Sequence, residues 1–340
     1  MRIGLAYDLK EKVPVSPTHP IDELEEYDSR ETIEGIAAAL EAQGHSICWL
    51  GGGREFLTAV LRESVDLVFN IAEGLGNYRS RESQVPGVLE MLDIPYTGSD
   101  PQCLAVCLDK PLTKQLVAMA GIDTPKWRVI SDSRQLGRID WKDFPFPAFI
   151  KPIHEGSSKG VHFASKVGSA EELTKTAGNL LEYYNQPVMV EDFIAGDEIT
   201  VGVVGNSPPR IVGIMRVVPK TNKADFIYSL EVKRDWERLV DYECPAQLEA
   251  GVLKRISDAS LKIFEVLGCR DFARIDFRLS REGIPSFLEI NPLPGLNSKT
   301  SDLVILARKM GWTYEALISA VLAAAIERYP HVPKKNSRHL

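Results

Sequence analysis

Apolar and polar residues alternate with two different periods along the first hundred residues, and this predicts strands and helices in turn. Short apolar runs of strand length are separated by stretches in which apolar residues recur every three or four positions, as on one face of a helix. Such alternation is typical of βαβ units and predicts a parallel sheet covered by helices. The expected strands are residues 2–7, 46–50 and 66–71, and the expected helices lie near 28–44, 54–63 and 82–93.

Capping and turn residues refine this pattern. The first helix is expected to begin near Asp28, with Glu31 placed for a capping-box contact, and to end at Gly44. The run Gly51-Gly52-Gly53 stands between a strand and a helix, but it lacks the spacing of a dinucleotide-binding fingerprint. We therefore expect a simple tight turn at these glycines.

The remainder of the chain predicts smaller α+β units. Residues 220–245 are charged and aromatic with weak periodicity, which predicts a long mobile loop. The other expected strands are 126–130, 146–151, 161–164, 188–193, 198–205 and 210–219, and the other expected helices are 109–120, 169–184, 247–267, 301–310 and 313–328. The chain is thus expected to be an α/β protein of three domains with a short tail.

The domain boundaries follow from where the pattern changes. We predict an N-terminal domain with a parallel α/β sheet (1–107), a central α+β domain (108–186) and a C-terminal α+β domain with an antiparallel sheet (187–330). Residues 331–340 are expected to be a basic tail. A chain of 340 residues is long enough for two or three such cores.

Residues 273–291 are predicted to form a β-hairpin that places four polar side chains on one face, because side chains alternate along a strand. The turn falls at residues 280–283, and the opposite face is apolar. Oxygen ligands beside an arginine suit magnesium that bridges phosphates. On alternation alone, an exposed sheet face with ordinary charges is the simpler interpretation. The four side chains are Arg274, Asp276, Glu289 and Asn291.

Composition narrows the classes of protein that the chain can be. The formal net charge of −7 argues against a broad surface for nucleic acid or for anionic membranes. No apolar run reaches membrane-spanning length and the first residues lack a signal-peptide pattern, so a cytoplasmic protein is expected. The five cysteines are predicted to be reduced core residues. A zinc site at Cys103 and Cys107 is not expected, because the pair lacks nearby partners in the sequence.

Two further segments have residues suited to a nucleotide. Lys151 ends a buried strand and is followed by a glycine–serine loop (155–161), whose amide groups can point at phosphate oxygens. The loop lacks the end of a P-loop, and by itself it would be an ordinary turn. The second segment, 188–194, is an apolar strand ending in acids, whose backbone edge could bind an adenine ring; a plain strand leading to a turn fits that local sequence equally well.

The order of these motifs resembles the ATP-grasp superfamily, and within it the D-alanine–D-alanine ligases. The resemblance covers roughly residues 60–325 and is carried by a strand-end lysine, a Gly-Ser-Ser loop, a Val-Glu-Asp-Phe-Ile linker, Arg-Ile-Asp and Glu-Ile-Asn. It is also carried by Pro95-Tyr96-Thr97-Gly98-Ser99 and by Asn291-Pro292-Leu293-Pro294-Gly295. It implies an ATP-dependent carboxylate–amine ligase that joins two amino acids through an acylphosphate. A non-catalytic nucleotide-binding regulatory protein with the same fold is the alternative.

The resemblance also implies roles for matching positions. Arg274 would stabilise negative charge on the carbonyl oxygen, and Ser157 would act in the lid over the phosphates. Two Mg²⁺ ions, with Mn²⁺ as an alternative, would be held by Asp276, Glu289 and Asn291. ATP would be bound by Lys110, Lys151, Ser157, Ser158, Glu191, Asp192, Phe193, Ile194, Glu198 and Lys233. A homodimer formed through the N-terminal domain is implied as well.

On the substrate side the chain departs from the family pattern. Glu25 falls at the right distance before the first helix to replace the family's ammonium-binding glutamate, or it is a solvated charge in an acidic run. Glu73 stands where the family has a histidine, and Arg234 where it has a tyrosine. Thr300 and Ser301 lie in a carboxylate-binding segment that is one residue longer. These changes predict amino-acid substrates other than two D-alanines, with charged or larger side chains.

Overall fold

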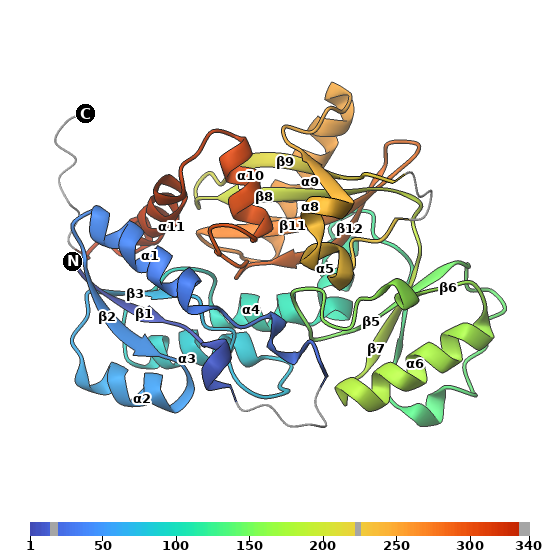
Figure 1. The fold of residues 1–340 in the computed structure, drawn as a ribbon, viewed down its shortest axis with the longest axis horizontal. Coiled ribbons are helices and arrows are strands. Elements are labelled where there is room, and N and C mark those ends of the chain that lie inside the picture. Colours follow the sequence, from blue (N-terminus) through green and yellow to red (C-terminus); the bar gives the residue numbers. More distant parts are fainter. Residues whose placement is uncertain (14–19, 222–225, 333–340) are drawn as a thin grey trace.

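Three sheets and eleven α-helices make up the part of the chain that the computed structural model describes, namely residues 1–13, 20–221 and 226–332. One sheet is parallel and the other two are antiparallel (Figure 1). This confirms the predicted α/β fold class. None of the described helices is both long and apolar enough to cross a membrane.

The N-terminal sheet has the strand order β2-β1-β3, with all neighbours parallel as the sequence predicts. One face packs on α1 and α11, and the other packs on α2 and α3, so apolar residues of both faces of β1 are buried. The elements are β1 (Arg2–Ala6), α1 (Arg30–Ala42), β2 (Ser46–Gly51), α2 (Gly53–Arg62), β3 (Leu67–Asn70) and α3 (Gln84–Met91).

The start of α1 differs from the prediction by one residue. Ser29, not Asp28, is the N-cap, and its hydroxyl accepts a hydrogen bond of 3.3 Å from the backbone N–H of Thr32. The Asp28 carboxyl is instead buried beside the Thr32 side chain. The expected capping box with Glu31 is therefore wrong, because a serine one position later can cap the same helix end.

Two consecutive helices, α4 (Pro101–Leu108) and α5 (Lys110–Met119), lead from the first sheet to the second. The central sheet has the order β4-β7-β5-β6, is antiparallel, and is covered on one face by α6. Its elements are β4 (Trp127–Ile130), β5 (Ala148–Pro152), β6 (Lys166–Val167), α6 (Ala170–Tyr184) and β7 (Val188–Asp192).

Two sequence predictions change in this region. The expected strand 161–164 is wrong: a 3₁₀ turn (Phe163–Ser165) follows the glycine–serine loop, and only the two residues of β6 pair with β5. The strand β7 pairs with β4 and β5, although the predicted boundary at residue 186 would assign it to the third domain. The domain boundaries stay predictions, and this pairing favours a boundary after Asp192.

The C-terminal sheet is antiparallel, with the order β10-β9-β8-β11-β12. Helices α9 and α5 cover one face, and α10 with α11 covers the other (Figure 1). Its elements are β8 (Gly196–Val204), β9 (Arg210–Pro219), β10 (Val240–Glu243), α9 (Ala250–Val266), β11 (Phe272–Ser280), β12 (Pro285–Asn291), α10 (Asp302–Lys309) and α11 (Tyr314–Arg328).

The segment predicted as a long loop, 220–245, contains regular structure. Beyond residues 222–225, which lie outside the described residues, it forms α7 (Leu230–Arg234), α8 (Trp236–Leu239) and the edge strand β10. Leu230 and Val232 are buried against the body of the protein, which explains why short helices form without a long periodic pattern. Most of the predicted tail, 331–340, also lies outside the described residues.

A buried aspartate connects elements that are far apart in the sequence. Asp271 is fully buried; its carboxylate accepts hydrogen bonds from the guanidinium of Arg328 at 2.7 and 2.9 Å. It also accepts from the N–H of Gly98 at 2.7 Å and from the amide of Asn206 at 3.0 Å. One carboxylate thus joins the loop between α3 and α4, the β8–β9 turn and the end of α11.

We expect Asp271→Asn to lower the free energy of unfolding by about 3 kcal/mol, because it leaves Arg328, of which only 16% of the side chain is exposed, without its counter-charge. Asparagine tolerates the positive φ of this position, so backbone strain is not added. Urea denaturation measures the change, with the exposed Asp258→Asn as the control. Equal stability of the two variants would contradict the role of this carboxylate.

Candidate active site

The hairpin β11–β12 presents its four polar residues on one face, as the alternation predicts. Asp276 lies directly opposite Glu289 and Arg274 lies opposite Asn291, in antiparallel register. Ala273, Ile275 and Phe277 point to the other face and are completely buried under α9. The apolar face therefore fixes the register, because a slip by one residue would move every charged side chain into the core.

The polar atoms of this face contact one another closely. The carboxylate of Asp276 accepts hydrogen bonds from the Arg274 guanidinium at 2.9 and 3.0 Å and from the Thr200 hydroxyl at 2.9 Å. A nitrogen of Arg274 lies 3.9 Å from the Glu289 carboxylate. The side-chain nitrogen of Asn291 is buried without a hydrogen-bond partner among the described residues. An additional polar partner is thus missing at this end of the face.

Two lysines of the central region face these carboxylates. The ammonium of Lys110, at the start of α5, lies 3.7 Å from Glu289, and Lys151, at the end of β5, also lines the cavity here. Burial by itself would raise the pKa of Glu289, but Lys110, Lys151 and Arg274 outweigh it and lower that pKa to about 2. Burial raises the pKa of Asp276, with Glu289 adding to the effect. Asp276 therefore has less positive charge near it than a buried carboxylate requires.

Beneath this surface, a buried glutamate of β7 is paired with two lysines, one on β5 and one on α5. The carboxylate of Glu191 lies 2.9 Å from the ammonium of Lys151 and 2.6 Å from that of Lys114. These two cations outweigh burial and lower the pKa of Glu191, whereas burial lowers the pKa of Lys114 to about 8. Glu191 therefore positions Lys151 and does not line the cavity.

The predicted adenine-binding linker is partly occupied by an arginine of β11. Arg278 donates hydrogen bonds to the carbonyl of Ile194 at 2.8 Å and to the carboxylate of Glu198 at 2.8 Å. Its guanidinium lies 5.0 Å from the centre of the Phe193 ring. Asp192 and Phe193 do not line the cavity, although Glu198 does. The Ile194 carbonyl has a second lone pair, so a nucleotide that used it would share this acceptor with Arg278.

The glycine–serine loop is held down by a buried ion cluster. Ser157 and Ser158 adopt positive φ of 48° and 61°, and the N–H of Gly156 donates to the carboxylate of Glu26. Arg81, of which 2% is exposed, lies 2.6 Å from Glu26 and 3.2 Å from Glu155. Lys159 lies 2.6 Å from Glu155 and 3.2 Å from Glu26. The N-terminal segment therefore keeps the loop closed over the cavity.

The short helix α7 carries the predicted lysine and arginine of this region. Lys233 lines the cavity, and its ammonium lies 5.0 Å from the centre of the Tyr228 ring. Arg234 forms an ion pair of 2.6 Å with Glu25, in which both side chains are partly exposed. Glu25, predicted to bind a substrate ammonium, is thus paired with a protein cation. Such an exposed pair contributes little to stability and can exchange partners.

Two cavities meet beneath the closed loop, and Lys233 and Asp302 line both. The smaller, of about 80 Å³, lies between the lysines and the hairpin face and is lined by Lys110, Lys151, Ser158, Glu198, Lys233, Asp276 and Glu289. The larger, of about 420 Å³, is lined by Glu25, Asp28, Glu73, Glu82, Ser157, Arg234, Arg274, Asn291, Thr300 and Ser301. The structure thus separates the predicted phosphate side from the predicted substrate side.

The larger cavity contains carboxylates whose burial outweighs the positive charge of the nearby Arg81. Glu73 and Glu82 form no salt bridge within the described residues, and only 8% of Glu82 is exposed. Burial raises the pKa of Glu82 to about 7 and that of Asp28 to about 7. Burial and the neighbouring Glu82 raise the pKa of Glu73 well above its usual range. This wall of the cavity therefore favours a positively charged ligand.

The turn before α10 forms the other wall. Ser301 is the N-cap residue of α10, and its hydroxyl accepts a hydrogen bond of 2.8 Å from the N–H of Asn297. Asp302 accepts a hydrogen bond of 2.9 Å from Tyr228 and lies 3.8 Å from Arg274. Thr300 is exposed at the rim. A carboxylate at this helix end would be near Arg274 but also near Asp302.

Several residues of the site were not found from the sequence. Arg81 and Glu82 belong to a polar run without recognisable periodicity, so nothing in the sequence shows that both are buried. Lys114 lies in an amphipathic helix where an exposed lysine is expected. Arg278 could have been noticed, since it shares the hairpin face with Arg274 and Asp276 at alternate positions.

Comparisons with known proteins agree with this architecture. A family model described as D-ala D-ala ligase C-terminus matches residues 116–323. D-alanine–D-alanine ligase of Aquifex aeolicus is 35% identical over 295 residues, covering 86% of this chain and 94% of that protein. An uncharacterised protein of Sinorhizobium fredii, y4sG, is 32% identical over 305 residues, covering 87% and 88%. The crystal structure of D-alanine–D-alanine ligase from Bacillus anthracis superposes with a TM-score of 0.73 at 23% identity, covering 96% and 98%.

The superposition shows that the three sheets are arranged as in ATP-grasp proteins, and the chain is an ATP-dependent ligase of this class. The family match covers more than half of the chain, and relatives above 30% identity extend over most of it. The chain therefore belongs to the D-alanine–D-alanine ligase family.

The buried acid Glu82 gives a test of the electrostatics. Its folded-state pKa of about 7 lies above the usual 4.5. Between pH 4.5 and 7 the folded protein therefore binds more protons than the unfolded protein does. The contribution of Glu82 to stability is present below pH 4.5 and is lost as pH rises through 7. We expect Glu82→Gln to raise the free energy of unfolding by about 1–3 kcal/mol at pH 8 and to leave it nearly unchanged at pH 4.5. Urea denaturation at both pH values measures this, with the exposed Glu41→Gln as the control; equal effects at the two pH values would contradict it.

Proposed function

We propose that this enzyme joins the carboxylate of one amino acid to the amine of a second through an acylphosphate, and that its substrates differ from two D-alanines. One observation carries the proposal: the half-buried cross-strand pair Asp276 and Glu289 lies opposite Lys110 and Lys151, beneath a closed glycine–serine loop. A carboxylate and a terminal phosphate repel each other, so cations must neutralise both before they can react.

The residues of the hairpin face fit magnesium. Asp276, Glu289 and Asn291 offer hard oxygen atoms, and a divalent cation beside Asp276 would offset the burial that raises the pKa of this carboxyl. The side-chain nitrogen of Asn291, which is buried without a partner among the described residues, is a donor that an oxygen of a bound phosphate or carboxylate would satisfy, whereas the amide oxygen would face the metal. Magnesium, when bound, would neutralise the terminal phosphates of ATP. Two ions, or Mn²⁺ in their place, are consistent with this donor set.

The other residues take roles that follow from their places. Lys110, Lys151 and Lys233 would hold phosphate oxygens, with Ser157 and Ser158 above them in the loop. Arg274 lines the larger cavity beside Asp276, where it can stabilise an oxyanion on the reacting carbonyl. The closed loop would exclude water, to which an acylphosphate is sensitive. Residues 191–194 would bind adenine and Glu198 the ribose beside Arg278, which already contacts the Ile194 carbonyl and one oxygen of Glu198.

The metal assignment is tested by Asp276→Ala. We expect this variant to lose at least 10³-fold in amino-acid-dependent release of ADP, because one ligand of the metal is removed. The exposed Asp143→Ala is the matched control and should retain full activity. A wild-type protein that binds ATP but never releases ADP would favour the alternative, a non-catalytic regulatory protein.

The substrate side supports a cationic partner. Glu73 and Glu82 form no salt bridge within the described part of the chain, and Arg81 offsets their burial only in part, so a substrate with an ammonium or guanidinium side chain would add the positive charge that they need. Glu25 could then receive the α-ammonium group after releasing Arg234, while the turn at Thr300 and Ser301 would receive a carboxylate. Both assignments rest on the residues that line the larger cavity.

Mass analysis of products from a mixed pool of D- and L-amino acids tests the substrate proposal. We expect dipeptides that contain a basic residue, and a KM for the basic substrate that falls between pH 6 and 8.5 as Glu82 loses its proton. Glu73→Gln should raise that KM about tenfold or more, whereas the exposed Glu34→Gln should not change it. Exclusive formation of D-alanyl-D-alanine would refute the substrate proposal without affecting the ligase assignment.

The homodimer and the cytoplasmic location remain proposals that rest on the family resemblance. The exposed side chains of Trp49, Leu57 and Leu61 on β2 and α2 offer an apolar surface on the N-terminal unit that a second copy could cover.

A further inference from the structure

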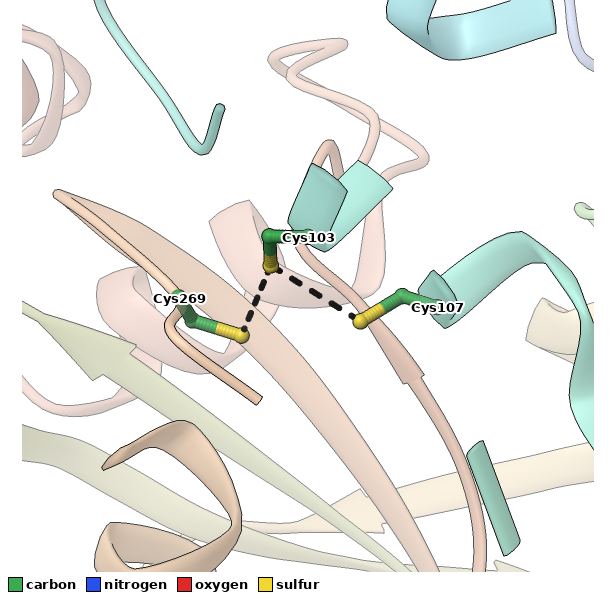
Figure 2. Close-up of side chains that lie close together, drawn as sticks. All are labelled: Cys103, Cys107 and Cys269. Atoms are coloured by element: carbon green, nitrogen blue, oxygen red, sulfur yellow. Dashed lines mark hydrogen bonds between the residues drawn. The ribbon is translucent and has the colours of Figure 1, made fainter. Parts of the chain in front are cut away.

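Three cysteines meet in the core that α4 and α9 form with the C-terminal sheet (Figure 2). Cys103 and Cys107 are four residues apart on α4, and Cys269 lies 166 residues beyond Cys103 in the sequence. The Sγ atom of Cys103 lies 3.5 Å from that of Cys269 and 3.8 Å from that of Cys107. All three sulfurs lie within 4.8 Å of one another, and the side chains are 2, 4 and 8% exposed for Cys103, Cys107 and Cys269. The expectation that Cys103 and Cys107 lack a partner is thus wrong, because the turn before β11 supplies Cys269.

The spacing of the sulfurs suits a shared ligand. A cation at about 2.3 Å from each of three sulfurs in a trigonal plane separates them by about 4 Å. The separations of Cys103 from its two neighbours are close to this value without any movement of the backbone. Small apolar side chains would fill this space equally well. The three thiols instead bring their sulfur atoms together at one point of the core.

The backbone places Cys103 where it can contact both other cysteines. Cys103 lies in the first turn of α4, where the N-cap residue Asp100 accepts a hydrogen bond of 2.9 Å from its N–H. The Cys103 thiol donates a hydrogen bond of 3.5 Å to the sulfur of Cys269, and its sulfur lies in hydrogen-bond contact with that of Cys107. Three sulfurs are thus already gathered around one point, and sulfur is the ligand type that a soft cation selects.

We propose that Cys103, Cys107 and Cys269 form a three-coordinate site for a soft monovalent cation with the chemistry of Cu⁺. Zinc is disfavoured because it takes four ligands, and no histidine, cysteine or carboxylate completes the group within the described residues. Thiolate sulfur is the ligand type that Cu⁺ prefers. Binding releases thiol protons, so the affinity rises with pH.

A cation at this site would act on the contact between α4 and the segment before β11, and not on the reaction. Cys103 and Cys107 belong to α4, whereas Cys269 precedes β11, the strand that carries Arg274 and Asp276. Arg270, next to Cys269, already forms an ion pair of 2.6 Å with Asp100 before α4. A bound cation would add a second connection between the same two segments.

Titration of the full-length protein with Cu⁺, in competition with a chromophoric Cu⁺ chelator, tests the proposal. We expect one Cu⁺ per chain and a rise in melting temperature on binding. Cys103→Ser and Cys269→Ser should weaken binding at least 100-fold, while Cys48→Ser and Cys244→Ser, which change cysteines outside the cluster, should leave it unchanged. Circular dichroism shows whether each variant is folded.

X-ray absorption of the Cu⁺-loaded wild-type protein provides a readout that does not depend on variants. We expect three sulfur ligands and no nitrogen or oxygen ligand. Equal binding by wild type and Cys103→Ser, a different ligand set, or preferential binding of Zn²⁺ over Cu⁺ in the same competition would overturn the proposal.

Discussion

The pairing of Asp276 with Glu289 across β11 and β12 is the constraint on which the rest of the site depends. Two buried carboxylates on neighbouring strands repel each other, and each would cost several kcal/mol without counter-charges. Lys110, Lys151 and Arg274 come from three different elements to supply them. The loops, the short helix α7 and the N-terminal segment then enclose the space that these charges define.

Local pattern was sufficient for most of the architecture. The parallel first sheet, the hairpin at 273–291 and its turn were predictable because each has a hydrophobic period of its own and a glycine or capping residue at its end. Predictions failed where structure depends on distant partners. The loop at 220–245 was misjudged because Leu230 and Val232 fix its short helices by burial, which no local period records. The strand at 161–164 was misjudged because a local 3₁₀ turn forms there instead, in which the Ser165 hydroxyl accepts a hydrogen bond from the N–H of His162.

The residues of the candidate site divide in the same way, into those that the local pattern predicts and those that depend on distant partners. Side chains alternate along a strand, so the polar residues of one hairpin lie on the same side of it. Arg274, Asp276, Glu289 and Asn291 could therefore be grouped from the sequence. The acids Glu73 and Glu82 come from a loop and a 3₁₀ turn, and only the structure shows that the ion pairs of the neighbouring Arg81 are made with Glu26 and Glu155 instead. The site of the three cysteines could not be predicted, because it depends on a contact between residues more than 160 positions apart in the sequence.

The ion cluster of Arg81, Glu26, Glu155 and Lys159 has a kinetic consequence. It holds the glycine–serine loop shut with charges of the protein itself, so the shut form is populated before any nucleotide arrives. Entry then has to wait for spontaneous opening, which takes part of the binding free energy. At high nucleotide concentration the observed association rate would level off at the opening rate of the loop. Loop opening, and not the encounter of nucleotide with protein, would then limit the rate of binding.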